Sequence, residues 1–455
     1  MAEWRYLAQN IVTREWVDMD LELRDVEIID ELSGPGGIMG SIAPEVLSAT
    51  VNGQRILKEW QTAIYAEDKA GEIRGAGLLV RSSAEDDTQR WQIECPGWSA
   101  YPTGMVYDGA ISWWDADPFD AVREIWAHLQ SFASGDLGLQ VTDLKSAARL
   151  SPIQPPDRPA DLADAEDVKA PLKGNKPNKG KQPKRKSGES DSAYDTRLVA
   201  WDQAYEVVVA AWEDDYQQRK IAYDVAKDLR DFQEDQNTAE QGVWDDTYGD
   251  LKPYELSWWE APDCGSEIDS LATQTPFDYR ERHAWNADRT DVEHFLDLGQ
   301  PTLGRRRQDL RFAVGENVIV IPPPEFDGDD FANEVIALGK GDGQAMLRSE
   351  LSQRDDRLRR SKVLSAKDVG DLNRLRALAD AELRFARTLG SIGELVILDH
   401  LNAPLGSFAT GDEIFVQAGG DGWFSTDMWV RILECRLRPD EDSRMTLSVV
   451  ASERA

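Results

Sequence analysis

Short apolar runs with a period of two dominate both ends of this sequence and limit the folds open to it. Five or so such runs lie between Trp16 and Cys95, separated by SGPGG, NG and acidic turns. Side chains on a β-strand alternate between its two faces, so this period predicts half-buried strands. Strands at such short intervals are typical of a small barrel or sandwich. We therefore expect a mainly β fold with α-helical additions.

The C-terminal end has the same order of strand, turn and strand. ELVILDH, EIFVQ, MWVRILECRL and RMTLSVV are predicted strands, and EIFVQAGGDGWFSTDMWVRIL echoes WQTAIYAEDKAGEIRGAGLLV near the start. The loop between the second and third of these strands contains Gly419, Gly420, Asp421, Gly422 and Trp423. Glycine permits positive φ and aspartate bonds its own backbone, so a hairpin turn explains this loop without a ligand.

Helices are predicted at three places around these strands. A helix over about 118–133 begins after Asp117, a residue that can cap it, and a short helix is expected at EIDSLATQ. A third helix is expected over about 366–389, because Ser365 can cap it and Gly390 can end it.

The middle of the chain differs from both ends. Residues 151–190 are rich in proline and lysine and have too few large apolar groups to offset the entropy of ordering, which predicts a linker. Residues 191–250 are expected to be a long helical insert, because bulky side chains recur at spacings of four and three, as in the seam of a coiled coil. An amphipathic helix packed on its own domain explains the same spacing. The candidate interaction residues of this seam are Tyr194, Leu198, Trp201, Tyr205, Val208 and Trp212.

The length predicts more than one domain, since 455 residues exceed what a single core usually holds. We expect an N-terminal β-barrel-like domain with a following helix over 1–150 and, after the linker and the insert, a second region over 251–455. This second region should combine α/β elements with a C-terminal β-barrel-like domain.

The net charge of −33 opposes a general affinity for nucleic acid or anionic membranes. Residues 169–186 break this rule with eight basic and no acidic side chains. This lysine tract could bind DNA phosphates, but it has no interleaved aromatic residues and has equally the composition of a solvated spacer. Since no apolar run reaches the roughly 18 residues that span a bilayer, and MAEWRYLAQN has no apolar signal region, we expect neither membrane insertion nor conventional secretion.

No catalytic, cofactor-binding or metal-binding residue is expected. The histidines lack HExxH or HxH spacing, the cysteines lack CxxC spacing, and there is no GxSxG elbow. ALGKGDGQAML lacks the spacing of a phosphate-binding loop, and its Asp342 would repel phosphate. Exposed tryptophans could stack on sugar rings or fill a subunit interface. The histidines, cysteines and paired tryptophans concerned are His128, His283, His294, His400, Cys95, Cys264, Cys435, Trp113, Trp114, Trp258 and Trp259.

Several phrases resemble one protein family. These are TPFDYRERHAWNADRT, PTLGRRRQDLRFAVGENVI, ANEVIALGKGDG, RDDRLRRSKV and HLNAPLGSFATGDEIFV, together with the opening pattern from GSIAPE to GEIRGAGLLV. They resemble the minor tail proteins of long-tailed actinobacteriophages, especially the baseplate hub or tail-tip protein. The resemblance covers about 1–135 and 262–455 and leaves 151–250 unmatched.

The resemblance implies a non-enzymatic virion component at the distal tail, assembled in the host cytoplasm and without a cofactor. Two β-barrel-like domains per chain would form a homotrimeric ring of six similar barrels that closes the tail tube and lets DNA pass at ejection. The implied partners are the distal tail protein, the tape measure protein and further tip proteins. A carbohydrate-binding or cell-wall-cleaving tail protein that uses tryptophans and a carboxylate pair is the alternative.

Overall fold

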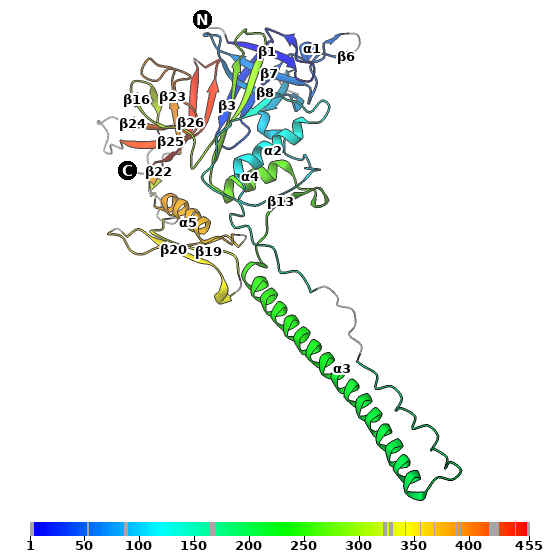
Figure 1. Cartoon of the computed structure of the whole chain (residues 1–455). Coiled ribbons are helices and arrows are strands. Elements are labelled where there is room, and N and C mark those ends of the chain that lie inside the picture. The colour runs from blue at the N-terminus through cyan, green and yellow to red at the C-terminus, as the bar shows by residue number, and fades with distance from the viewer. Residues whose placement is uncertain are drawn as a thin grey trace. The chain divides into compact units, whose positions relative to one another are not determined.

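The computed structural model shows a mainly β chain with five α-helices among its described residues (Figure 1). The described residues are 4–51, 54–85, 90–162, 170–321, 325–326, 331–341, 343–354, 356–367, 369–387, 390–391, 393–417, 427–441 and 443–452. They form two compact units, one of residues 1–154 with 253–455 and one of residues 155–252.

The larger unit is built on a ten-stranded sheet that contains strands from both ends of the chain. Its central step is the antiparallel pairing of β25 with β3, which places Cys435 opposite Asp30 and Leu437 opposite Ile28. The order is β17 (Val318–Val320), β23 (Glu394–Ile397), β26 (Arg444–Ala451), β25 (Met428–Arg438), β3 (Leu23–Glu31), β4 (Gly37–Ile42), β10 (Arg90–Pro96) and β9 (Arg81–Glu85), with β24 (Glu413–Gln417) joining β25 to β16 (Arg306–Ala313).

One hydrophobic core serves both chain ends. Ile28 and Ile38 from the N-terminal strands pack in one cluster with Ile432 and Leu447 from the C-terminal strands, and all four are buried. Regions 1–150 and 251–455 therefore share a sheet and a core, where the sequence predicted two separate barrel-like domains. The expected period of two is clear in β26, whose Met445, Leu447 and Val449 are buried on one face.

A second sheet has apolar side chains on both faces. It contains β2 (Glu15–Asp18), β1 (Arg5–Asn10), β7 (Thr62–Glu67) and β8 (Ile73–Leu78) in this order. In β7, Ile64 points into the core of the ten-stranded sheet, while Tyr65 points into a second core with helices α2 (Pro118–Gln130) and α4 (Cys264–Gln274). Figure 1 shows α2 and α4 next to each other beside these strands. Asp117 caps α2 by accepting a hydrogen bond from the backbone N–H of Phe119 at 2.9 Å, as the sequence predicts.

The remaining elements of the larger unit are short or local. Helix α5 (Leu372–Ala386) packs on β20-β19-β21, with Leu375 and Ala379 buried against Val335. It starts at residue 372 and not near 366 as expected, because the N–H of Ala366 still donates to the carbonyl oxygen of Leu338 and Asp371 caps the helix by accepting a hydrogen bond from the N–H of Arg374 at 2.7 Å. The other elements are α1 (Pro44–Leu47), β5 (Thr50–Val51), β6 (Gln54–Arg55), η1 (Trp98–Ala100), β11 (Ala110–Trp113), β12 (Leu139–Val141), β13 (Tyr254–Ser257), η2 (Trp258–Glu260), β14 (Asp278–Trp285), β15 (Val292–Gly299), β18 (Glu325–Phe326), β19 (Glu334–Leu338), η3 (Gly343–Ala345), β20 (Arg348–Ser352), β21 (Ser361–Ser365) and β22 (Gly390–Ser391).

The smaller unit consists of one long helix and an extended segment beside it. Helix α3 (Asp191–Tyr248) is 58 residues long, and Ser190 caps its first turn by accepting a hydrogen bond from the N–H of Ala193. Residues 151–190 were expected to be a linker, and 155–190 belong to the smaller unit. Their described part instead runs back along α3 and bonds to it, as Figure 1 shows.

The hairpin over 411–437 is present, because β24 and β25 pair antiparallel with Ile414 opposite Val430. Its turn, with Asp421 and Trp423, lies outside the described residues.

The shared core predicts a large difference between two neighbouring positions of β25. Ile432→Ala removes a fully buried side chain and should lower the free energy of unfolding by about 2–5 kcal/mol, because it leaves a cavity. Leu433, next to it, is 39% exposed, so Leu433→Ala should cost no more than about 0.5 kcal/mol. Urea unfolding of the two variants beside the wild type measures the difference; equal losses would contradict a core that joins both chain ends.

Candidate functional site

The predicted seam residues lie on the face of α3 that the extended segment covers. We call residues 170–188 of that segment the strap. The side chains of Tyr194, Leu198, Trp201, Tyr205 and Trp212 are all half-buried, whereas most side chains of α3 are exposed. Val208 differs from them, since its side chain is 52% exposed.

Hydrogen bonds and cation–π contacts join the strap to these aromatic residues. Tyr205 donates a hydrogen bond to the carbonyl oxygen of Pro177 at 3.2 Å, and Tyr194 donates one to that of Pro183 at 3.1 Å. The ammonium of Lys179 lies 4.6 Å from the ring centroid of Trp201, within the range of a cation–π interaction. The strap therefore occupies the face that was expected to meet another helix.

Within residues 155–162 and 170–252, α3 is the only helix, so the structure shows no helical partner for the seam. A coiled coil with sister chains stays a prediction. It would have to use positions such as Val208, which the strap leaves exposed.

A second candidate site is a buried chain of polar side chains in the larger unit. His283 on β14 and His294 on β15 are opposite each other in the ladder, and their Nδ1 atoms lie 3.0 Å apart. The Nε2 atom of His294 is 3.4 Å from the hydroxyl of Tyr65, which donates to Gln9 at 2.9 Å. Trp98 packs against both imidazoles, at centroid distances of 4.8 Å and 4.3 Å.

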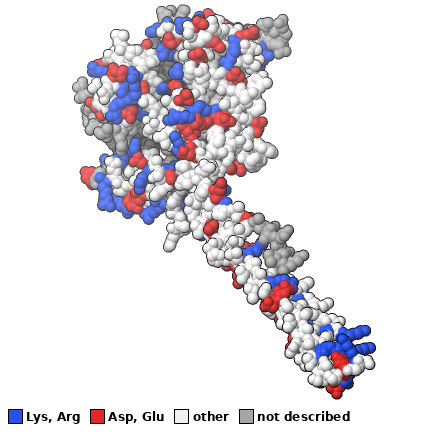
Figure 2. Space-filling model, in the orientation of Figure 1, with Lys and Arg blue, Asp and Glu red and all other residues white. Residues whose placement is uncertain are grey.

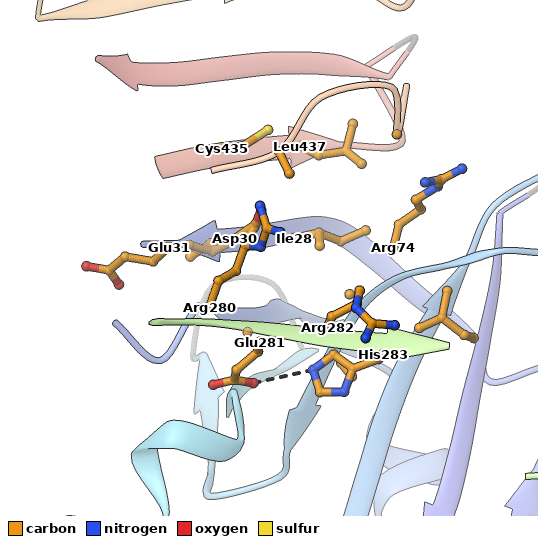
Figure 3. Close-up of a pocket in the computed structure, with 18 of the residues that line it drawn as sticks. Ile28, Asp30, Glu31, Arg74, Arg280, Glu281, Arg282, His283, Cys435 and Leu437 are labelled. Carbon is orange, nitrogen blue, oxygen red and sulfur yellow. Dashed lines mark ion pairs between the residues drawn. The ribbon is translucent and has the colours of Figure 1, made fainter. Parts of the chain in front are cut away.

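Glu281 anchors one end of this chain. Its carboxylate accepts hydrogen bonds from the backbone N–H groups of Trp98 and Ser99, at 2.8 Å and 2.7 Å, and from the hydroxyl of Ser99. His283 Nε2 lies 3.3 Å from the same carboxylate, and this contact is drawn in Figure 3. The carboxylate therefore has its acceptor positions filled by the fold.

The pKa of His294 lies well below its ordinary value. Burial is the main cause, because it disfavours the charged imidazolium, and the positive charges of His283 and Arg14 act in the same direction. His294 is completely buried and therefore neutral near neutral pH. The stacked ring of Tyr65, with its centroid 5.8 Å away, encloses it further.

A cavity of about 220 Å³ adjoins this region, and Figure 3 shows its lining. Asp30 is one of the carboxyl groups that line it, and burial raises the pKa of Asp30 above the usual range. The hydroxyl of Thr410 donates to Asp30 at 3.1 Å, and Arg280 donates to the carbonyl oxygen of Thr410 at 2.7 Å. These three polar groups thus bond to one another, which ties β3, β14 and the 405–410 loop together.

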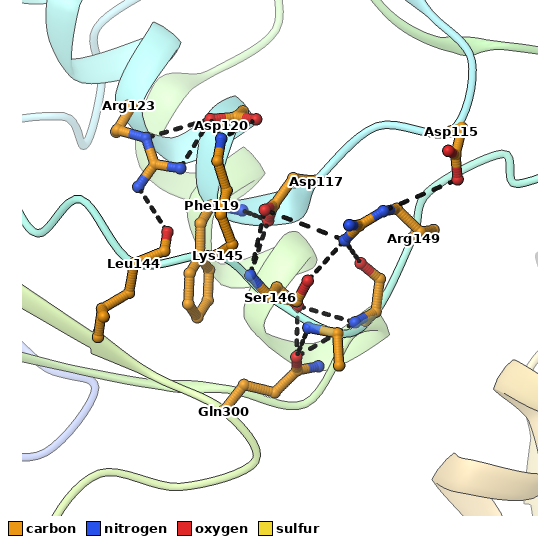
Figure 4. A network of polar contacts seen from close by, with 12 residues as sticks. Asp115, Asp117, Phe119, Asp120, Arg123, Leu144, Lys145, Ser146, Arg149 and Gln300 are labelled. Atoms are coloured by element: carbon orange, nitrogen blue, oxygen red, sulfur yellow. Dashed lines mark hydrogen bonds and ion pairs between the residues drawn. The ribbon is translucent and has the colours of Figure 1, made fainter.

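A third polar cluster surrounds the start of α2 and is drawn in Figure 4. Asp117 accepts from the N–H of Ser146 at 3.1 Å, and Asp120 pairs with Arg123 and Lys145, both at 2.7 Å. A surface cavity beside this cluster is lined by Trp113 and Trp114 as well as by these charged residues. The carboxylates of Asp117 and Asp120 are thus satisfied within the chain, so neither is left as an unpaired acid or base.

The described residues contain no group of three histidine, cysteine or carboxylate side chains that could hold a metal ion. The cysteine thiols are not activated, because burial raises the pKa of Cys95 and Cys435, and of Cys264 to about 11. His128 contacts Asp108 at 3.2 Å, and His400 accepts a hydrogen bond from the N–H of Asn402 at 3.1 Å. Among the helices of the described part, none is long and apolar enough to cross a membrane.

Sequence reasoning missed the histidine pair and the strap contacts. The pair had a signal, because YRERHAWNA and DVEHFLDL are both strand-like and each carries one histidine, but their register was not predictable. The composition of the strap predicts disorder, whereas the even spacing of its prolines is the signal of regular contacts.

No family model matches the sequence, and no curated protein matches it. Among solved structures, the chain is similar to a 43 kDa tail protein of prophage MuSo2 from Shewanella oneidensis, with a TM-score of 0.50, 9% identity and 98% of each chain covered. It is also similar to prophage tail protein gp18 from Listeria monocytogenes, with a TM-score of 0.50, 8% identity, and 99% of this chain and 94% of that one covered. A tail protein from Neisseria meningitidis MC58 matches with a TM-score of 0.49 at 11% identity, over 99% of this chain and 97% of that one. At these identities the similarity is one of fold.

The neutral buried His294 predicts a stability that depends on pH. A base whose pKa is lowered by folding takes up its proton first in the unfolded chain, so its contribution is complete above about pH 6.5 and is lost as the pH falls below that value. His294→Gln should therefore reduce the loss of unfolding free energy on going from about pH 7.5 to 5.5, by up to about 1.4 kcal/mol per pH unit below 6.5.

Urea unfolding at several pH values measures this slope. Tyr65→Phe is the matched control, because it removes one hydroxyl from the same network and keeps the imidazole; it should lower stability and preserve the wild-type slope. If the free energy of unfolding of His294→Gln depended on pH as steeply as that of the wild type, the pH dependence could not be assigned to His294.

Proposed function

We propose that this chain is a structural component of a phage-type tail, in the hub of its baseplate or tail tip. The observation that carries this proposal is the likeness of fold to two prophage tail proteins over nearly the whole length of both partners. The sequence phrases resemble proteins of the same class.

The polar groups of the larger unit support a structural role over an enzymatic one. Glu281 and Asp117 accept hydrogen bonds from backbone N–H groups, and Asp120 pairs with neighbouring cations. A catalytic carboxylate must keep an oxygen free for substrate. These three instead join separate segments of the chain, Glu281 to residues 98–99, Asp117 to Ser146 and Asp120 to Lys145.

We further propose that the chain assembles as a homotrimer whose ring closes the tail tube and lets DNA pass at ejection. The distal tail protein, the tape measure protein and further tip proteins would be its neighbours, in a virion assembled in the host cytoplasm. The finer proposal, an origin in long-tailed actinobacteriophages, rests on the sequence phrases alone.

Local pairing of the basic side chains supports the passage of DNA without tight binding. Arg306 pairs with Glu413 at 2.7 Å, and Arg307 with Asp309 at 2.6 Å and Asp412 at 3.4 Å. The Arg307 guanidinium lowers the pKa of Asp309 to about 2, so this pair stays charged on both sides. Cations already paired with carboxylates release fewer counterions on meeting phosphate and bind it less tightly. Figure 2 shows basic and acidic side chains interspersed in the same way over one face of the larger unit.

Electron microscopy of the purified chain and of the virion tests the hub proposal. We expect a particle of three chains of 51.0 kDa each, with a channel on the threefold axis that is poor in lysine and arginine, and an antibody to the chain that labels the tail tip. A particle without a threefold channel, or a label elsewhere on the virion, would refute the proposal. A channel lined by Arg305, Arg306 and Arg307 would refute only the idea of unhindered DNA passage.

A second candidate function is favoured by the cavity beside α2, because two adjacent tryptophans, Trp113 and Trp114, line it together with charged side chains. Aromatic rings beside polar groups are suited to binding sugars. The structural proposal predicts no saturable binding of purified host cell-wall polysaccharide in a calorimetric titration. Binding that is lost in the Trp113→Ala/Trp114→Ala variant and kept in Trp258→Ala/Trp259→Ala, whose tryptophans are 59% and 64% exposed, would favour the second function instead.

A further inference from the structure

The strap contains a repeat of six residues. Its sequence divides into PLKGNK, PNKGKQ and PKRKSG, which begin at Pro171, Pro177 and Pro183. These three prolines are half-buried, while nearly all other strap side chains are exposed. Gly174 and Gly180, at the same place in the first two units, both have positive φ, of 67° and 73°. The backbone therefore repeats its conformation along with its sequence; in the third unit, lysine takes the place of this glycine.

Helix α3 contains a repeat of eleven residues opposite the strap. Its first three units are DSAYDTRLVAW, DQAYEVVVAAW and EDDYQQRKIAY, starting at residues 191, 202 and 213. Eleven residues make almost three whole helical turns, so equivalent positions return to nearly the same face. Each unit places an acid first, a tyrosine fourth and an aromatic residue last, and all six aromatic side chains are half-buried.

The two repeats have matching lengths. Eleven helical residues rise about 16.5 Å. Six residues of extended chain at about 3.1 Å each span roughly 18.6 Å, which is within about 2 Å of this rise. The contacts follow the same count: Pro177 and Pro183 are six residues apart, and the tyrosines that they bind, Tyr205 and Tyr194, are eleven apart. The strap and α3 run antiparallel. A step of six residues forward along the strap therefore corresponds to a step of eleven residues back along the helix, and the same contact recurs.

The charges repeat with the same register. Lys173 pairs with Glu213 at 2.9 Å, Lys179 pairs with Asp202, and Arg185 pairs with Asp191. Thus basic residues six apart meet acidic residues eleven apart. In the first two units the ammonium also lies over two rings: Lys173 lies 5.1 Å from Trp212 and 5.3 Å from Tyr216, and Lys179 lies 4.6 Å from Trp201 and 5.3 Å from Tyr205. Aromatic faces and a carboxylate together form a site that selects a cation.

We propose that this face of α3 is a recognition surface for an extended chain with proline and a basic residue at six-residue intervals, and that its ligand is the strap of the same chain. Each six-residue unit binds the helix through a cation and its paired acid, and the second and third units also do so through the carbonyl oxygen of their proline. In this proposal the lysine tract is neither a free spacer nor a DNA-binding element, and the aromatic seam residues Tyr194, Trp201, Tyr205 and Trp212 serve contacts within the chain.

The proposal predicts which side chains can be joined by a carbodiimide, which links a lysine to a carboxylate only where the two are in contact. In the full chain we expect the links Lys173–Glu213 and Lys179–Asp202. The out-of-register links Lys173–Asp202 and Lys179–Glu213 are internal controls and should be at least tenfold rarer. A mixture of ¹⁵N-labelled and unlabelled protein identifies the source of the strap, because only exchange between copies gives links of mixed isotope.

Charge reversal tests whether the pairs hold the strap. Lys179→Glu should speed tryptic cleavage after Lys181 and Lys184 several-fold, because the strap is released. Lys179→Glu with Asp202→Lys should restore much of the wild-type rate. Val208→Asp, on the exposed part of α3, is the control and should leave this rate unchanged.

Deletions test the matched lengths. Removal of 177–182 together with 202–212 takes out one unit of each repeat and should keep the protection from trypsin. Removal of 177–179 with the same helical residues breaks the register and should abolish it. Equal protection in both deletions, in-register links no more frequent than out-of-register ones, or links mainly of mixed isotope would overturn the proposal. None of these outcomes depends on whether the chain forms a tail hub.

Discussion

The pairing of β25 with β3 is the contact on which the larger unit depends. It joins Glu434 to Glu31 and Leu437 to Ile28, so the ladder forms only when segments about 400 residues apart meet. Closing so long a loop costs entropy, although this cost grows slowly with length. It is offset by a core that neither chain end could complete alone, since Ile28 and Ile432 lie in one buried cluster. The backbone hydrogen bonds fix the register of that core, and the side chains of Asp30, Thr410 and Arg280 fasten a loop across it.

The same slow growth of closure entropy explains how a 98-residue unit can be inserted without disturbing the sheets. The chain leaves the larger unit after Leu150, which bridges to Ala116, and re-enters it at Tyr254, which pairs with Trp113. The two ends of the insert are therefore both held by the backbone of residues 113–116. Because the ends of the insert are already close together, its length can change with little effect on the surrounding fold. The insert can therefore change its number of repeats, provided that the strap and α3 change together.

Local features were predictable from the sequence, and long-range register was not. The cap of Asp117, the start of α3 after Ser190 and the hairpin of β24 and β25 all follow from patterns within a few residues. The sharing of one sheet by both chain ends could not be predicted in this way. The period of two shows which face of a strand is buried, but it does not show which other strand pairs with it. The same limit applies to His283 and His294, whose pairing depends on the register of β14 and β15. For the strap the composition was misleading: proline, glycine and lysine are typical of disorder when each residue acts alone, but here their spacing gives every unit a partner.

The charge of the chain can be understood from the same local pairing. At −33 the protein as a whole repels other acidic surfaces, yet its basic tract would offer each copy a means to bind its neighbours or a passing nucleic acid. At physiological salt, charges more than about 8 Å apart are largely screened, so a lysine interacts mainly with whatever lies next to it. Lys173 has Glu213 at 2.9 Å and two aromatic rings at 5.1 Å and 5.3 Å. An acid on another molecule would have to displace all three at once. The basic residue at the third position of each six-residue unit is therefore held by an acid of its own helix, which limits its contacts with acids on other molecules.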